Sequence, residues 1–332
     1  MPLSRRSMLA ATGGFAMSSA LPGILKAAGD PASPIQMLDP SFAALIDEKV
    51  PRKLGGDFLW AEGPVWLPAQ KSLIFSDIKN NRMIRWDQTT GGISDFRKPA
   101  DNANGNTIDR QGRLVTCQHR TASITRTEPD GTITTLASSF EGQRFNSPND
   151  IVCKSDGSIW FTDPAFGPTP SEGMQPPVTT GRIYRLDPRT QAVTMLMGDI
   201  PGPNGLVFSP NESALYVVEA RAQPHRLLVR YDVVKGGTAI ANRQVIFDCG
   251  AGLADGFRVD TQGNLWCGWG GGTGLDGVAI INPAKGKMIG HIALPERCAN
   301  LAFGGPDRRL LLMAASTSLY GLRVKAQGIA GR

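Results

Sequence analysis

Residues 144–163, RFNSPNDIVCKSDGSIWFTD, carry the pattern that decides the fold. The amide side chain of Asn149 is followed by apolar residues, by Gly157 eight positions on, by Ile159 ten positions on and by Asp163 fourteen positions on. Two alternating apolar runs separated by a glycine turn are typical of an antiparallel β-hairpin. Such a hairpin returns to the face where it began, so we expect Asp163 to lie near Asn149.

Six copies of this pattern occur along the chain, with the glycine at plus eight in three of them and one extra residue in the copies at Glu62 and Asn204. The polar residues that open the copies are Glu62, Asn104, Asn149, Asn204, Asp255 and Asn300. The steps between them are 42, 45, 55, 51 and 45 residues. A period of about 40 to 50 residues with several short strands per unit is typical of a β-propeller blade. The sequence therefore predicts an all-β fold, a six-bladed β-propeller.

The six opening residues also predict a central metal site. If the first strand of each hairpin is the innermost strand of its blade, these side chains converge on one mouth of the central tunnel. Buried amides and carboxylates need a partner, which a hard cation with oxygen ligands supplies. Two carboxylates and several amide oxygens suit calcium better than zinc, which favours His and Cys. The alternative is that Asn and Asp merely form turns, but six copies in phase favour the metal site.

The composition fits one propeller domain that does not cross a membrane. The chain has 39 Gly and 24 Pro to separate short strands and 41% hydrophobic residues to fill cores. It has no run of about 18 apolar residues, so we expect no membrane-spanning helix. The cysteines lack C-x-x-C spacing and are expected mostly in the core, with one disulfide left open; they are Cys117, Cys153, Cys249, Cys267 and Cys298.

The N-terminus resembles a twin-arginine export signal. Arg5 and Arg6, with Leu9 three residues later, precede a weakly apolar run of small residues. Three of the positive charges, on Arg5, Arg6 and Lys26, belong to this segment, so the formal charge of +6 does not indicate a nucleic-acid-binding face. We predict an export signal at residues 1–28, an N-terminal extension at 29–50, the propeller at 51–326 and a C-terminal tail at 327–332. The expected partners are the export machinery and a small substrate, and the expected location is periplasmic or secreted.

Several segments together resemble the family of gluconolactonase, regucalcin (senescence marker protein) and luciferin-regenerating enzyme. The segments are EGPVW at 62–66, SPND at 147–150 with FTDP at 161–164, PNGL at 203–206 with LYV at 215–217, and DGF at 255–257 with GNLW at 263–266. The resemblance extends from about Lys53 to Val324. Ser147 stands where animal members carry an arginine, and the stretches 102–105 and 117–120 resemble the bacterial gluconolactonase branch.

The resemblance implies hydrolysis of a sugar lactone by a propeller with one divalent metal ion, usually calcium. Glu62, Asn204 and Asp255 match the family's metal ligands, and Asn149 matches a fourth ligand or a substrate-contacting amide. Asp255 is also similar to the general base of the family. The metal would polarise the lactone carbonyl and stabilise the oxyanion, while Asp255 or a metal-held water would supply the attack.

Three further residues are expected to contact the substrate. His119 returns to the mouth beside Asn104, which favours a role in substrate binding or proton transfer for His119 and in substrate binding for Asn104. Trp269 follows a strand in a glycine-rich run, and its ring is expected to offer a stacking face for a sugar.

The insertion at residues 165–180 is rich in Pro and Gly and is predicted to form a lid over the mouth. Phe166 and Met174 would then shape the substrate pocket.

Two other functions remain open at this level. One is a calcium-dependent hydrolase of aryl esters or organophosphates, and the other is a non-catalytic propeller that binds a ligand. The pair Glu62 and Asp255 argues against a pure scaffold. The absence of a G-x-S-x-G motif and the presence of only three histidines argue against a Ser-His-Asp triad.

Overall fold

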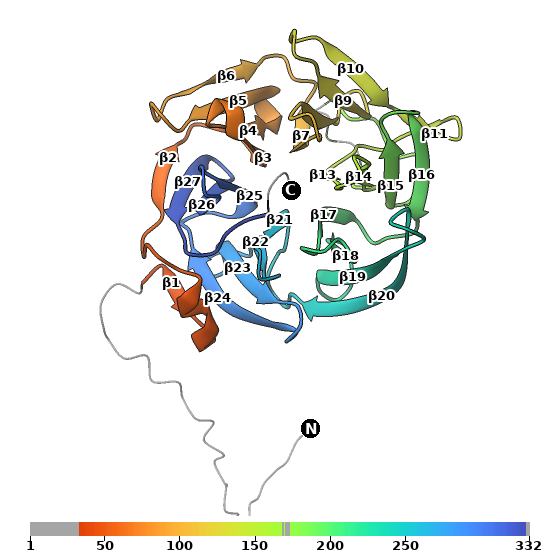
Figure 1. The fold of residues 1–332 in the computed structure, drawn as a ribbon. Helices are drawn as coiled ribbons and strands as arrows, with labels where there is room; N and C mark the ends of the chain where they lie inside the picture. Colours follow the sequence, from red (N-terminus) through yellow and green to blue (C-terminus); the bar gives the residue numbers. More distant parts are fainter. Residues whose placement is uncertain (1–32, 168, 170–172, 330–332) are drawn as a thin grey trace, which may run out of the picture. The chain divides into compact units, whose positions relative to one another are not determined.

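Six antiparallel β-sheets form the blades of a propeller around a central axis (Figure 1). The computed structural model describes residues 33–167, 169 and 173–329, so the export signal predicted for residues 1–28 lies outside the described residues. The predicted hairpin glycines Gly112, Gly157 and Gly263 have φ of 77°, 87° and 86°, a turn conformation that other residues adopt at a cost. The all-β, six-bladed fold predicted from the repeat is confirmed.

The strands of each of the first four blades follow the sequence. The first blade contains β3 (Ala61–Leu67), β4 (Ser72–Asp77), β5 (Arg82–Asp87) and β6 (Ile93–Arg97). The second contains β7 (Ala103–Ile108), β8 (Leu114–Gln118), β9 (Ser123–Thr127) and β10 (Ile133–Ala137). The third contains β13 (Ile151–Cys153), β14 (Ile159–Asp163), β15 (Arg182–Asp187) and β16 (Ala192–Met197). The fourth contains β17 (Pro203–Phe208), β18 (Ala214–Glu219), β19 (Leu227–Val234) and β20 (Ala239–Asp248).

Strands from near the N-terminus complete the last two blades. The fifth blade contains β21 (Phe257–Val259), β22 (Leu265–Trp269), β23 (Gly277–Asn282) and β24 (Lys287–Ala293), with β1 (Ile35–Met37) added outside β24. The sixth contains β25 (Cys298–Gly304), β26 (Leu310–Ala315) and β27 (Ser318–Arg323), with β2 (Arg52–Gly55) as its outer strand. In the pairing of β2 with β27, Arg52 faces Gly321 and Lys53 faces Tyr320. This pairing closes the ring.

The innermost strands begin on one face of the ring, which we call the site face, and end on the other, the far face. These strands are β3, β7, β13, β17, β21 and β25, and they surround the axis in Figure 1. Each hairpin returns to the site face: Asp77 pairs with Ala61, and Glu219 pairs with Pro203. The opening residues therefore lie together at one end of the axis, as the repeat predicts.

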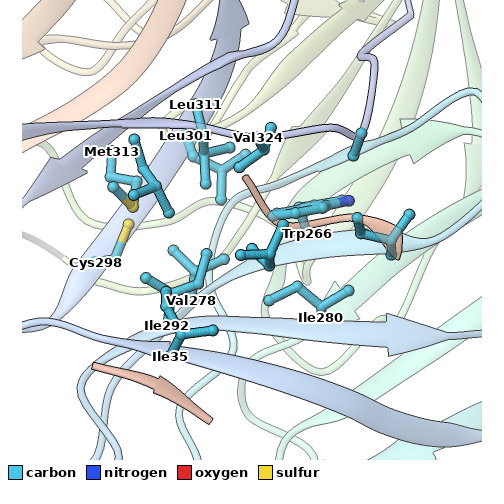
Figure 2. Close-up of a cluster of buried hydrophobic side chains, with 14 of the residues drawn as sticks. Ile35, Trp266, Val278, Ile280, Ile292, Cys298, Leu301, Leu311, Met313 and Val324 are labelled. Atoms are coloured by element: carbon cyan, nitrogen blue, oxygen red, sulfur yellow. The ribbon is translucent and has the colours of Figure 1, made fainter. Parts of the chain in front are cut away.

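The hydrophobic core lies between neighbouring blades. Figure 2 shows the cluster between the fifth and sixth blades, where Trp266 and Val278 meet Leu301 and Met313. Ile35 of β1 joins the same cluster. Burial of each large aliphatic side chain stabilises the fold by about 1.5–3 kcal/mol. All five cysteines are buried and unpaired, which agrees with a core role.

Two short segments complete the described structure. Strands β11 (Ser139–Phe140) and β12 (Gln143–Arg144) form a small hairpin before the third blade. At the C-terminus, the N–H of Gly328 donates to the carbonyl of Arg308 at 2.9 Å, and the carbonyl of Gln327 accepts from Thr261 at 2.8 Å. Residues 327 and 328 are thus held against the far face.

Candidate functional site

A pocket of about 250 Å³ lies on the axis at the site face, where the inner strands begin. Five of the six opening residues line it: Glu62, Asn104, Asn149, Asn204 and Asp255. All five side chains are buried. The structure therefore brings the predicted metal ligands together, although they come from five different blades.

Glycines allow the opening residues to approach each other so closely. Glu62, Asn104, Asn204 and Asp255 are each followed directly by a glycine. A Cβ atom on any of these glycines would clash with the opening residue of the next blade or the residue beside it. At Gly105 the backbone N–H donates to the carbonyl of Asn149 at 2.8 Å, which links the second blade to the third. The polar side chains therefore lie close together because the backbones that carry them are in van der Waals contact from one blade to the next.

The Glu62 carboxylate of the pocket forms no ion pair with a basic side chain among the described residues. Burial, together with the neighbouring Asp255 and Asp150, raises the pKa of Glu62 to about 8, against the hydrogen bonds from the Gly63 N–H and the Asn300 amide. Desolvation and like charges both favour the neutral form of a carboxyl group, and a bound cation would reverse that balance. The donor set therefore fits a cation.

The amides add neutral oxygen ligands. The Oδ1 atom of Asn204 is buried and has no hydrogen-bond partner among the described residues. The backbone beside it is fixed, because the Thr162 hydroxyl donates to the Asn204 carbonyl at 2.8 Å and the Asn149 N–H donates to the Thr162 carbonyl at 2.8 Å. An unpaired buried acceptor is costly unless something binds it, which again fits a hard cation.

The type of donor distinguishes between metals. Within the described part of the chain, no three His, Cys, Asp or Glu side chains are placed to hold a metal ion together. The candidate ligands are instead two carboxylates and two or more amides. Such all-oxygen sets suit calcium or magnesium better than zinc.

His119 lies beside Asn104, as the hairpin predicts. Its Nε2 atom is 3.0 Å from Asn104 Nδ2, and both side chains are buried in the pocket wall. Because the amide nitrogen can only donate, Nε2 accepts and the imidazole proton lies on Nδ1. His119 thereby orients the Asn104 amide group so that the Asn104 Oδ1 atom points away from the imidazole.

Three residues that the sequence pattern did not single out also shape the pocket: Trp60, Lys79 and Arg297. Arg297 forms an ion pair with Asp255 Oδ2, and its guanidinium lies 5.5 Å from the centre of the Trp60 ring. Lys79 lies 5.2 Å from the same ring. Trp60 precedes Glu62 by two residues and Arg297 precedes Asn300 by three, so a pattern that starts at the opening residue excludes both.

The insertion after β14 lies over the site face. Phe166, Thr169 and Met174 line the pocket, where the sequence placed the lid. The guanidinium of Arg221 stacks on Phe166 at 5.0 Å and donates to the carbonyls of Ala165 and Phe166 at 2.9 and 2.7 Å. The first part of the lid is therefore fastened to the fourth blade.

Trp269 does not occupy the position that the sequence suggested. Its side chain is only 2% exposed and packs in a hydrophobic cluster with Leu265 and Cys267, so it offers no face to a sugar. Side chains at i and i+2 of a strand share a face, and Leu265, Cys267 and Trp269 of β22 all face the core. The aromatic rings of Trp60 and Phe166 line the pocket instead.

Asn300 is the one opening residue outside the pocket lining. Its Oδ1 accepts from the N–H of Leu301 at 2.8 Å and lies 3.4 Å from Arg258 Nη1. It lies against Glu62 and forms part of the layer beneath the pocket.

Comparison with known proteins gives a consistent set of relatives. The family model for the SMP-30/gluconolactonase/LRE-like region matches residues 60–317. A gluconolactonase of Zymomonas mobilis subsp. mobilis is 30% identical over 90% of this chain and 88% of its own length. A pentonolactonase of Haloferax volcanii is 31% identical over 74% of this chain and 78% of its own length. A solved gluconolactonase structure from Xanthomonas campestris has a TM-score of 0.80, with 32% identity, and the match covers 88% of this chain and 94% of that one.

Proposed function

Because the chain belongs to the SMP-30/gluconolactonase/LRE-like family, we propose that it is a lactonase that hydrolyses a sugar lactone to the corresponding hydroxy acid. The observation that carries the proposal is the convergence of two carboxylates and three amides on one pocket, with the Asn204 oxygen left unpaired. The similarity to the gluconolactonase of Zymomonas mobilis over nearly the whole chain supports the choice of substrate class. Within the described residues, no helix is both long and apolar enough to cross a membrane.

We propose further that one divalent metal ion, calcium by preference, is held by Glu62, Asn149, Asn204 and Asp255. Their oxygens are the ligands that calcium prefers, and the unpaired Asn204 Oδ1 supports the assignment. When bound, such an ion supplies Lewis-acid polarisation of the lactone carbonyl and charge for the oxyanion.

The chain's own residues would provide the proton chemistry. Arg297 holds Oδ2 of Asp255, which leaves Oδ1 to accept a proton from an attacking water. The oxygen of the Asn104 amide, whose nitrogen contacts His119, would accept a hydrogen bond from a hydroxyl of the sugar. The lid residues Phe166 and Met174 would cover the bound substrate and limit access of bulk water.

A pH-indicator assay with a panel of aldonolactones tests this function. The protein is assayed as isolated, after chelator treatment and after addition of calcium, alongside Asp255→Asn. We expect calcium to restore acid release after chelation, and Asp255→Asn to lower kcat by about 100-fold or more, as for loss of a general base. Asp156→Asn, in a far-face turn, is the matched control. Metal binding without turnover of any lactone would refute the chemistry but not the metal site; absence of metal binding would refute both.

We also propose that the protein is exported through its twin-arginine-type N-terminus. The support is the pair Arg5 and Arg6 before a weakly apolar run. The double substitution Arg5→Lys and Arg6→Lys should leave the protein in the cytoplasmic fraction, whereas Lys26→Gln should not. Equal export of both variants would rule out the twin-arginine route.

A further inference from the structure

A second and larger cavity, of about 470 Å³, lies on the axis toward the far face. Its upper wall consists of residues two positions after five of the six opening residues: Pro64, Asn106, Ile151, Leu206 and Ala302. These residues follow the opening residues along the innermost strands, so this tier lies on the far-face side of the ring of metal-ligand candidates. The volume is in the range of small-molecule binding sites.

The wall of this cavity is mainly apolar. Below the upper tier it is formed by Trp66, Val152, Val207 and Phe303, all of them buried. Ile329 of the C-terminal tail lines it as well. A polyhydroxylated sugar acid would lose its hydration against such a wall without replacement, so the product of the proposed lactonase reaction does not fit there.

The charges in the wall have one sign. Three of its residues are basic, Lys71, Arg258 and Arg308, and no Asp or Glu is among the described residues that line it. Lys71 lies at the exposed rim, whereas Arg258 is 6% exposed and lies at the inner end. The electrostatic complement of this cavity is an anion with an apolar body.

Arg258 forms one long ion pair among the described residues, with Asp150, and its Nη1 atom also donates to Asn300 Oδ1 at 3.4 Å. Its Nη1 atom donates to the Phe257 carbonyl at 2.8 Å, and its Nη2 atom donates to the Pro64 carbonyl at 3.4 Å. The nearest carboxylate oxygen, Asp150 Oδ2, is 3.9 Å from Nη1 and has no hydrogen-bond partner among the described residues. Because this ion pair is longer than a hydrogen bond, it compensates the buried guanidinium only in part, and a ligand carboxylate would add a two-point hydrogen-bonded pair.

A second hydrogen-bond donor in the cavity wall, the indole of Trp66, also lacks an acceptor among the described residues. The indole Nε1 of Trp66 is buried and, in the described part of the chain, has no hydrogen-bond acceptor. Trp66 lines the cavity, so a ligand oxygen within the cavity is the available source of an acceptor.

We propose that this cavity is a second binding site, which takes a small amphipathic carboxylic acid whose carboxylate pairs with Arg258 and whose hydrocarbon body fills the apolar space. The site has no Asp, Glu, His, Ser or Cys among its described lining residues, so its role is binding and not hydrolysis. The proposal is independent of the lactonase function, because it concerns different residues at the other end of the axis.

Isothermal titration calorimetry of the metal-free protein with decanoate tests the proposal, with decanol as the uncharged probe of equal chain length. We expect one saturable decanoate site per chain and weaker binding of decanol. Arg258→Gln should weaken decanoate binding by about tenfold or more, as expected for loss of a charge-assisted contact, and leave decanol binding unchanged. Arg258→Lys, which keeps the charge, should retain part of the affinity if the glutamine variant is too unstable to assay.

Two further variants locate the binding. Thr89→Trp places a large ring at the exposed rim of the cavity and should block decanoate while lactonase activity is unchanged. Lys79→Gln, at the other end of the axis, should leave decanoate binding unchanged. Absence of saturable decanoate binding would overturn the proposal, and so would an equal loss of decanoate binding and decanol binding in Arg258→Gln. Decanoate binding that appears only when residues 330–332 are deleted would also overturn it, because the occupant would then be the chain's own C-terminus.

Discussion

Asn204 shows how much of the site depends on a single unpaired atom. Its Oδ1 is buried beside two carboxylates, and the polypeptide supplies no donor for it within the described residues. A residue whose oxygen is satisfied only by a bound ion contributes to stability only when that ion is present.

Asn204→Asp tests this interpretation. Without metal, a third carboxylate beside Glu62 and Asp255 should lower the melting temperature because of like-charge repulsion. With calcium, the extra negative charge should increase metal affinity, so the calcium-induced rise in melting temperature should exceed that of the unsubstituted protein. The measurement is differential scanning calorimetry at pH 8 with chelator or calcium, with Asn211→Asp in an exposed turn as control. An equal calcium response in both variants would contradict the assignment of Asn204 as a ligand.

Asp163 gives a second test, this time of pH dependence. It accepts hydrogen bonds from the N–H groups of Asn146 and Ser147 at 2.9 and 2.8 Å, and burial raises its pKa to about 7. Because the folded pKa lies above the unfolded value of about 3.8, the protonated form favours folding. This contribution is fully present below about pH 4 and is lost as the pH rises through 7.

We therefore expect the stability of the unsubstituted protein relative to Asp163→Asn to fall as the pH rises from about 4 to 8. Urea unfolding at several pH values measures the difference in free energy of unfolding, and the titrations common to both proteins cancel. A difference that stays constant across this range would show that the Asp163 pKa is not raised.

At the scale of the strand, the glycines after the opening residues decide whether the blades can converge. Gly205 follows Asn204, and a Cβ atom there would clash with the backbone carbonyl of Asp255 in the next blade. The motif Asn-Gly or Asp-Gly thus combines a ligand with the space that lets the next ligand approach.

Gly205→Ala should separate β17 from β21 and lower both stability and metal affinity. We expect a loss of about 1–3 kcal/mol in the free energy of unfolding, which is typical of overpacking, and a weaker calcium response. Gly198→Ala is the control, because its added Cβ would lie at an ordinary 3.7 Å from Met195 Sδ. Loss of stability without loss of metal affinity would mean that the close approach serves only the fold.

The sequence was sufficient to predict the elements that recur in several blades. It did not identify pocket residues that occur in one blade only. The spacing around Asn149, Gly157 and Asp163 was enough to place the hairpins, the blades and the polar ring, because each of the six copies opens on a polar residue and three of them share the glycine turn. Arg297 and Trp60 lie outside the repeat unit as defined, so nothing marked them. Trp269 was assigned to the pocket from its glycine-rich surroundings, although the alternation with Leu265 and Cys267 already indicated the core.

At the scale of the whole molecule, strand β2 closes the ring together with nearby backbone contacts, such as the N–H of Ala61 on the carbonyl of Ser316 and the bridge of Ile46 with Val324. Strand β2 is the outer strand of the sixth blade, and it joins the start of the propeller to its end. Strand β1 adds only a fifth strand to a blade that is already complete.

Proline substitutions in these two strands should therefore have unequal effects. Arg52→Pro with Lys53→Pro removes two N–H groups from β2 and should lower the melting temperature and weaken calcium binding, because opening the ring separates ligands in different blades. Gln36→Pro in β1 should lower the melting temperature less and leave calcium binding unchanged. Equal effects of the two would show that β2 is not required for closure.

The position of this seam also sets the order in which the protein can mature. A chain growing on the ribosome displays β2 early, but its partner β27 is among the last strands to emerge. Until then the nascent protein is an incomplete propeller. The edge strands at its two ends have unpaired backbone N–H and C=O groups, which can pair with strands of other chains. The native ring can therefore form only after synthesis is nearly complete. Chaperone binding to the incomplete propeller should then affect the yield of folded protein more than the stability of any single blade does.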